Sequence, residues 1–222
     1  MEQVSREMLH RLAVERSGEL VQLVSDLIRI PSENPTGTQR EVVDFVENYL
    51  RQAGISYEEV GENPDFPCIV AKMGADEGFS IILNGHLDVV PAGDRSQWDF
   101  DPFAGTVTDT QILGRGTSDM KAGVAGLLFA MKLLKESGAE LKGNIRLHLV
   151  SDEESGGEFG SRWLCDHGYA DGADACLIAE PTSGDDIEIG QKGGLTVVLK
   201  AHGKSAHGSL GGFKGDNAIL KL

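Results

Sequence analysis

The sequence predicts an α/β protein built on a mostly parallel sheet with helices on both faces. Short apolar runs that suit buried strands alternate with longer segments whose apolar residues recur at helical spacing. Several predicted strands end in acidic residues, and 29 glycines provide the tight turns that such a fold needs. The 222 residues, 40% of them hydrophobic, are enough for one large domain or for one domain and part of another.

The first part of the chain is predicted to form two helices and three strands. Apolar residues recur at helical spacing from about Ser5 to Ile30, and Pro31 ends that pattern. A second helix carries apolar residues from Val42 to Leu50. Short strands, separated by turns that contain Gly, Asn or Pro, are predicted at residues 55–60, 68–73 and 79–83.

The middle of the chain is predicted to hold a covering loop, a hairpin and a long helix. Residues 91–103 are polar and too numerous for a simple connection, so we expect them to cover or shape a site. A hairpin is expected at residues 106–113. An apolar face that begins at Val124 predicts a helix, with Ser118 or Asp119 at its N-cap. The alternation continues with a strand, a helix and a strand at residues 145–150, 158–167 and 175–179.

The pattern changes from about Gly190 onward. Residues 195–201 alternate between apolar and polar or small side chains, as in a half-exposed antiparallel strand. A helix is expected to begin near Asp216. We therefore divide the chain into a first domain, residues 1–188, and the beginning of a second, smaller α+β domain, residues 189–222.

The charge balance and the cysteine count exclude several classes of protein. The formal net charge is −15, from 20 basic and 35 acidic side chains, which argues against nucleic acid or an anionic membrane as a partner. No apolar run approaches membrane-spanning length and the N-terminus has no apolar signal segment, so we expect a cytoplasmic protein. The cysteines are odd in number and form no Cys-x-x-Cys pair, which argues against a disulfide framework or a thiolate zinc site.

Acidic side chains and one histidine stand where predicted strands end or, for Asp119, at a loop-to-helix junction. In a parallel sheet the carboxyl ends of the strands form the edge at which ligands bind. Five acids gathered beside an imidazole would repel one another strongly without a cation. The sequence therefore predicts a metal site at this edge. The candidate residues are His86, Asp88, Asp119, Glu153, Glu154 and Glu180.

Several of these residues also have a purely structural interpretation. Residues two apart in an extended chain point to the same side, so His86 and Asp88 can be a plain hydrogen-bonded pair. Asp119 can be no more than a helix N-cap, and Glu153 no more than a solvated acid beside a ligand. These alternatives stay open at the level of the sequence.

Four stretches of the chain resemble the M20 family of metallopeptidases and deacylases. This group includes acetylornithine deacetylase, succinyl-diaminopimelate desuccinylase, aminoacylase-1 and glutamate carboxypeptidase. The stretches follow the family's order and are residues 85–91 (GHLDVVP), 114–121 (GRGTSDMK), 151–156 (SDEESG) and 180–182 (EPT). The resemblance implies a zinc-peptidase-like catalytic domain followed by an inserted domain that serves in dimerisation or as a lid.

The resemblance also assigns the metal ligands. His86 and Glu180 would hold one zinc ion, Glu154 would hold a second, and Asp119 would bridge the two. Zinc accepts imidazole nitrogen and carboxylate oxygen, and cobalt or manganese are the alternatives. The peptide bond that follows the bridging aspartate, here Asp119–Met120, is often cis in the family.

The catalytic groups follow from the same resemblance. Glu153 would be the general base that takes a proton from the attacking water and passes it to the leaving amine. Asp88 would orient His86. His207 resembles the second-domain histidine that, in dimeric members, reaches the active site of the other subunit and stabilises the oxyanion.

Together these matches predict a zinc-dependent hydrolase that cleaves the amide bond of an N-acyl amino acid or a small peptide, and a homodimer in the full-length protein. The family's chain is considerably longer and returns to the first domain to supply a last histidine ligand. We therefore expect this chain to be an N-terminal portion of such an enzyme. The alternative is a catalytically incomplete fragment that acts only as a metal-binding or interaction module. A serine or cysteine hydrolase is disfavoured because the chain has no nucleophile elbow.

Overall fold

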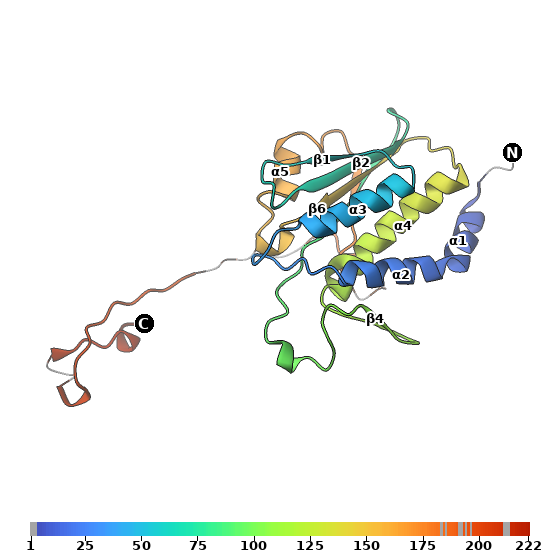
Figure 1. Cartoon of the computed structure of the whole chain (residues 1–222). Coiled ribbons are helices and arrows are strands. Elements are labelled where there is room, and N and C mark those ends of the chain that lie inside the picture. The colour runs from blue at the N-terminus through green and yellow to red at the C-terminus, as the bar shows by residue number, and fades with distance from the viewer. Residues whose placement is uncertain are drawn as a thin grey trace. The chain divides into compact units, whose positions relative to one another are not determined.

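The structure is a computed structural model that describes residues 4–182, 184, 186–190, 193, 195, 197–210 and 214–222. The chain divides into two units, Met1–Gly184 and Asp185–Leu222 (Figure 1). In the described part of the chain, no helix combines the length and the apolar character needed to cross a membrane.

The first unit is built on a mixed sheet of five strands. The strands are β1 (Tyr57–Val60), β2 (Cys68–Gly74), β3 (Ser80–His86), β6 (Asn144–Val150) and β7 (Ala175–Ile178). Their order across the sheet is β1-β2-β6-β3-β7. β3 runs parallel to β6 and β7, whereas β2 pairs antiparallel with β1 and β6. Only β2 therefore runs against the others, which confirms the predicted α/β class and its mostly parallel sheet.

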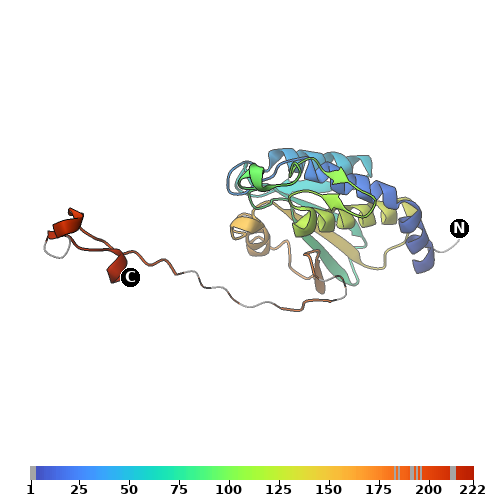
Figure 2. The ribbon, with the colours of Figure 1, turned by 90° about the horizontal axis from the view of Figure 1, so that it is seen from below.

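Helices cover both faces of this sheet. They are α1 (Arg6–Glu15), α2 (Ser17–Ile28), α3 (Arg40–Gln52), α4 (Ala122–Ser137) and α5 (Ser161–Asp166). α2, α3 and α4 share the main core on one face, and Figure 2 shows them together on that side. Leu164 of α5 packs on the other face against Val150 and Cys68. The single helix expected up to Ile30 is interrupted at Arg16, which separates α1 from α2.

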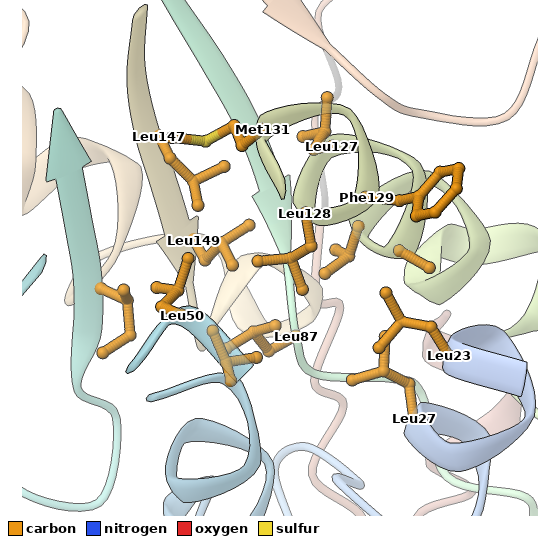
Figure 3. Close-up of a cluster of buried hydrophobic side chains, with 14 of the residues drawn as sticks. Leu23, Leu27, Leu50, Leu87, Leu127, Leu128, Phe129, Met131, Leu147 and Leu149 are labelled. Atoms are coloured by element: carbon orange, nitrogen blue, oxygen red, sulfur yellow. The ribbon is translucent and has the colours of Figure 1, made fainter. Parts of the chain in front are cut away.

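The main core fixes the strand that leads into the candidate site. Leu147 and Leu149 of β6 point into the cluster around Leu128 of α4, and all three are fully buried (Figure 3). Val150 packs in the second cluster on the opposite face. A fully buried leucine side chain contributes about 1.5–3 kcal/mol to the free energy of unfolding. β6 is therefore anchored from both sides up to its last residue.

Shorter elements surround this framework. The predicted hairpin is present as β4 (Thr106–Val107) paired antiparallel with β5 (Ile112–Leu113). The loop at residues 91–103 packs through Ala92 and Phe103 against Val89, and the Trp98 indole N–H donates to the Ala92 carbonyl at 2.9 Å. This loop is therefore held beside the end of β3.

The second unit has little regular structure among its described residues. The strand expected at residues 195–201 is wrong, because residues 195 and 197–201 form no strand. A strand needs a neighbour for its N–H and C=O groups, and the isolated bridge in this unit joins Lys204 to Asp216 instead. The helix expected from Asp216 is only a 3-10 turn, Ile219–Lys221.

Candidate metal centre

The candidate site lies at the carboxyl ends of β3, β6 and β7. β3 pairs in parallel with both neighbours, so its last residue, His86, lies beside Val150 at the end of β6. Glu153 follows β6 and Glu180 follows β7 within a few residues. The sheet thus brings side chains that are far apart in sequence to one edge.

His86 is almost fully buried, and one of its ring nitrogens forms a hydrogen bond with the backbone. Nδ1 lies 2.8 Å from the carbonyl oxygen of Asp88, which can only accept, so Nδ1 carries the hydrogen. Nε2 lies 3.0 Å from Asp119 Oδ1 and 3.4 Å from Glu180 Oε1. Ligand atoms of these three residues all lie within 4.8 Å of one another. A metal-ligating imidazole is typically fixed in this way through its other nitrogen.

The paired glutamates after β6 take different positions. Glu153 Oε2 lies 3.9 Å from His86 Nε2, and its side chain is half exposed. Glu154 lies outside the group of His86, Asp119 and Glu180, and its Oε1 accepts a hydrogen bond from the Val90 backbone N–H at 3.3 Å. The roles of Glu153 as general base and of Glu154 as ligand of a second ion stay predictions.

Asp88 is a fully buried carboxylate that accepts hydrogen bonds from several N–H groups. Its Oδ1 accepts from the Glu153 backbone N–H at 3.2 Å, and its Oδ2 accepts from the Glu154 backbone N–H at 3.1 Å. Oδ1 also lies 3.5 Å from His86 Nδ1. Asp88 therefore contacts His86 and the turn that carries both glutamates. This geometry supports the orienting role of Asp88, which stays a prediction.

The electrostatics of the site favour a cation. Burial alone would lower the pKa of His86, but the hydrogen bonds and charge of Asp88 outweigh it and raise this pKa to about 9. Burial raises the pKa of Glu154, and the charge of Asp119 raises it further. Burial also raises the pKa of Glu180, and nearby carboxylates add to that effect while His86 opposes it. The site thus stabilises positive charge and contains carboxylates that repel one another.

Asp119 lies in an irregular turn between β5 and α4. Its backbone is extended, with φ −119° and ψ 104°, and its carboxylate contacts His86. The N-cap expected at Ser118 or Asp119 is therefore wrong, since α4 begins only at Ala122 and no side chain caps it. The peptide bond between Asp119 and Met120 is cis, as the family resemblance implied.

Two buried polar residues beside the site were not predicted from the sequence. Lys121 Nζ donates to the carbonyl oxygens of Leu27 at 3.0 Å and Ile30 at 2.7 Å, at the end of α2. Asn34, in the loop that follows α2, donates from Nδ2 to Asp88 Oδ2 at 2.8 Å. All three bonds join residues more than fifty positions apart, so no local pattern in the sequence reveals them.

Glu180 depends on a close approach between α4 and the end of β7. A Cβ atom added to Gly123 would lie 2.1 Å from the carbonyl oxygen of Ala179. We expect Gly123→Ala to displace the chain at Ala179, because the atom in the way belongs to the backbone. The free energy of unfolding should fall by about 1–3 kcal/mol, the usual range for overpacking. Urea denaturation followed by circular dichroism measures this change.

Gly126 of the same helix is the matched control. A Cβ atom added to it would meet nothing within 4 Å. Gly126→Ala should raise the free energy of unfolding by about 0.5–1 kcal/mol, because alanine loses less backbone entropy in a helix. A Gly123→Ala protein as stable as Gly126→Ala would contradict the close packing of α4 on the end of β7.

His207 is an exposed residue of the second unit. Its Nδ1 accepts a hydrogen bond from the Ser209 backbone N–H at 3.3 Å and lies 2.8 Å from Ser209 Oγ. With Nδ1 as the acceptor, the hydrogen of a neutral ring lies on Nε2. Nε2 is then a donor, as oxyanion stabilisation requires, and that role of His207 stays a prediction.

Comparison with curated proteins shows strong similarity to desuccinylases. The chain is 36% identical over 199 residues to a probable succinyl-diaminopimelate desuccinylase of Staphylococcus epidermidis, a match that covers 90% of this chain and 48% of the relative. It is 38% identical over 199 residues to the succinyl-diaminopimelate desuccinylase of Rhodospirillum centenum, covering 84% of this chain and 50% of the relative. The chain thus spans about half the length of the curated relatives it matches.

Solved structures share the fold. Human carnosine dipeptidase 1 matches with a TM-score of 0.67 and 24% identity over 78% of this chain and 40% of that protein. A dinuclear metal-binding peptidase of the M20 family from Bacillus subtilis matches with a TM-score of 0.54 and 23% identity over 72% of this chain and 42% of that protein. The model of peptidase family M20/M25/M40 matches residues 82–207, more than half of the sequence. The chain therefore belongs to peptidase family M20/M25/M40.

Proposed function

We propose that this chain carries the metal-binding part of a zinc-dependent hydrolase that cleaves the amide bond of N-acyl amino acids or small peptides. The observation that carries the proposal is the group of His86, Asp119 and Glu180 at one edge of the sheet, with ligand atoms within 4.8 Å of one another. The similarity to desuccinylases points to N-acyl amino acids as the first substrates to test.

The donor set fits zinc. Zinc ions take imidazole nitrogen and carboxylate oxygen, and His86 Nε2 faces two carboxylates while Nδ1 is bonded to a carbonyl. In the proposed centre His86 and Glu180 would hold one ion, Glu154 would hold the second, and Asp119 would be a ligand of both. Cobalt and manganese accept the same donor types, so the identity of the metal is left to measurement.

The residues around this centre have different roles in the proposed reaction. When bound, the metal ions would make a water molecule more acidic and polarise the carbonyl of the substrate. Glu153, half exposed and 3.9 Å from His86 Nε2, takes the proton of the attacking water and delivers it to the leaving amine. Asp88 keeps His86 oriented. His207 donates a hydrogen bond to the oxyanion from the other subunit of a homodimer.

This proposal also includes the organisation and location of the protein. Residues 1–188 form the catalytic domain, and residues 189–222 begin a domain for dimerisation or for covering the site. The net charge of −15 supports small-molecule substrates rather than nucleic acid or membrane partners. We propose that the protein acts in the cytoplasm.

The test measures metal content and hydrolysis in the same preparation. We expect about two zinc ions per chain by elemental analysis, as in two-metal hydrolytic sites. We also expect release of free amino acid from N-succinyl or N-acetyl amino acids, and loss of that activity on chelation. Zinc bound without any hydrolysis would favour the metal-binding module. A folded protein that binds no zinc would contradict the proposed centre.

A further inference from the structure

The loop that follows α2 runs alongside the chain that leaves β3. Asn34 N donates to the Val89 carbonyl at 2.9 Å, and Val89 N donates to the Ser32 carbonyl at 2.9 Å. The Ser32 hydroxyl donates to the Leu87 carbonyl at 2.7 Å. This short parallel pairing places residues 32–34 next to residues 87–89, which include Asp88.

The side chain of Asn34 joins two separate parts of the candidate site. It is only 2% exposed. Nδ2 donates one hydrogen to Asp88 Oδ2 at 2.8 Å and the other to the Ser155 hydroxyl at 2.9 Å. Asp88 lies just beyond β3, whereas Ser155 lies in the turn after β6 that also contains Glu153 and Glu154. One amide nitrogen thus connects the ends of two neighbouring strands.

The chemistry of this position requires an amide. Only the NH₂ group can face a carboxylate, so Asp88 fixes which way the Asn34 amide is turned. An aspartate at position 34 would bring a second carboxylate against buried Asp88 and would repel it. An alanine would leave Asp88 with one donor fewer and Ser155 without this donor.

We infer that Asn34 is a positioning residue of the metal centre, which holds Asp88, and with it His86, in a fixed relation to the Glu153–Ser155 turn. The expected effect of Asn34 on metal binding rests on the proposed function. The expected effect of Asn34 on the turn rests on the hydrogen bonds alone. Side chains that orient metal ligands typically change metal affinity by about 10–100-fold when they are replaced.

The test compares Asn34→Ala with Ser32→Ala. Ser32 is the matched control, because it is a buried polar residue of the same loop whose hydroxyl donates to the Leu87 carbonyl rather than to the Asp88 carboxylate. Zinc affinity is measured by competition with a chromophoric chelator. Amide hydrogen exchange at Glu153 and Glu154 is measured on the metal-free protein, since both backbone N–H groups donate to Asp88.

We expect Asn34→Ala to weaken zinc binding by about 10–100-fold and to speed exchange at both amides, while Ser32→Ala changes neither. Equal zinc affinities and equal exchange rates in the two variants would overturn the inference. If the unaltered protein binds no zinc, the proposed function fails and the exchange rates alone decide the role of Asn34.

A second variant covers the case in which Asn34→Ala does not fold. Ser155→Ala removes the other end of the same link at an exposed position. It should speed exchange at Glu153 and Glu154 and weaken zinc binding in the same direction as Asn34→Ala. Unchanged exchange and unchanged zinc affinity in Ser155→Ala would overturn the link between Asn34 and the turn.

Discussion

Replacement of Glu153 by glutamine is expected to lower the rate of amide hydrolysis by about 10²–10⁴-fold, the usual contribution of a general base. The glutamine amide has the same shape but cannot take a proton from water at neutral pH. Glu153 lies 3.9 Å from His86 Nε2, farther than Asp119 and Glu180, so it is not needed to complete the first metal position. Zinc content should therefore stay unchanged in Glu153→Gln.

The measurement is the turnover number on an N-acyl amino acid, taken together with zinc per chain on the same sample. Glu158→Gln is the control, because it makes the same change in charge at an exposed residue near the same turn. Glu158→Gln should hydrolyse substrate at the rate of the unaltered protein. Turnover retained by Glu153→Gln would refute the assignment of the base, and turnover lost together with zinc would make Glu153 a metal ligand instead.

The ends of the central strands could be predicted from the sequence because burial fixes them. Leu147 and Leu149 face the main core and Val150 faces the second cluster, so apolar residues of β6 are buried on both faces up to the point where the polar turn begins. Such a strand cannot shift along the sheet without exposing apolar side chains. The residues that follow it are therefore held at the edge, where the acids of the site were expected.

The contacts within the site could not be predicted in the same way. Periodicity reports which residues are buried, but it does not report which residue a buried polar group contacts. Asn34 bonds to Asp88, and Lys121 bonds to the end of α2, across long stretches of intervening chain. Asp119 differs from these two residues. Its position before a helix suggested an N-cap, whereas the family resemblance placed it with His86 in the metal site, and its Oδ1 lies 3.0 Å from His86 Nε2.

Asp88→Asn is expected to lower the free energy of unfolding by about 3 kcal/mol or more. Both carboxylate oxygens of Asp88 accept backbone N–H groups, Oδ1 from Glu153 and Oδ2 from Glu154, and Oδ2 also accepts the Asn34 amide. An asparagine has a single acceptor oxygen, so either orientation of its amide sets an NH₂ group against a donor. Hydrogen bonds to a charged group contribute about 1.5–3 kcal/mol each, and a buried donor without a partner adds a further cost.

Urea denaturation of the metal-free protein measures this change without any contribution from metal binding. Asp76→Asn makes the same substitution at a side chain that is 95% exposed and forms an ion pair with Lys72. Surface ion pairs contribute about 0–1 kcal/mol, so this control should be nearly as stable as the unaltered protein. Equal denaturation midpoints for the two variants would mean that the Glu153–Ser155 turn holds its place without the Asp88 carboxylate. The effect of Asn34 on the turn would then depend on its direct hydrogen bond to the Ser155 hydroxyl rather than on Asp88.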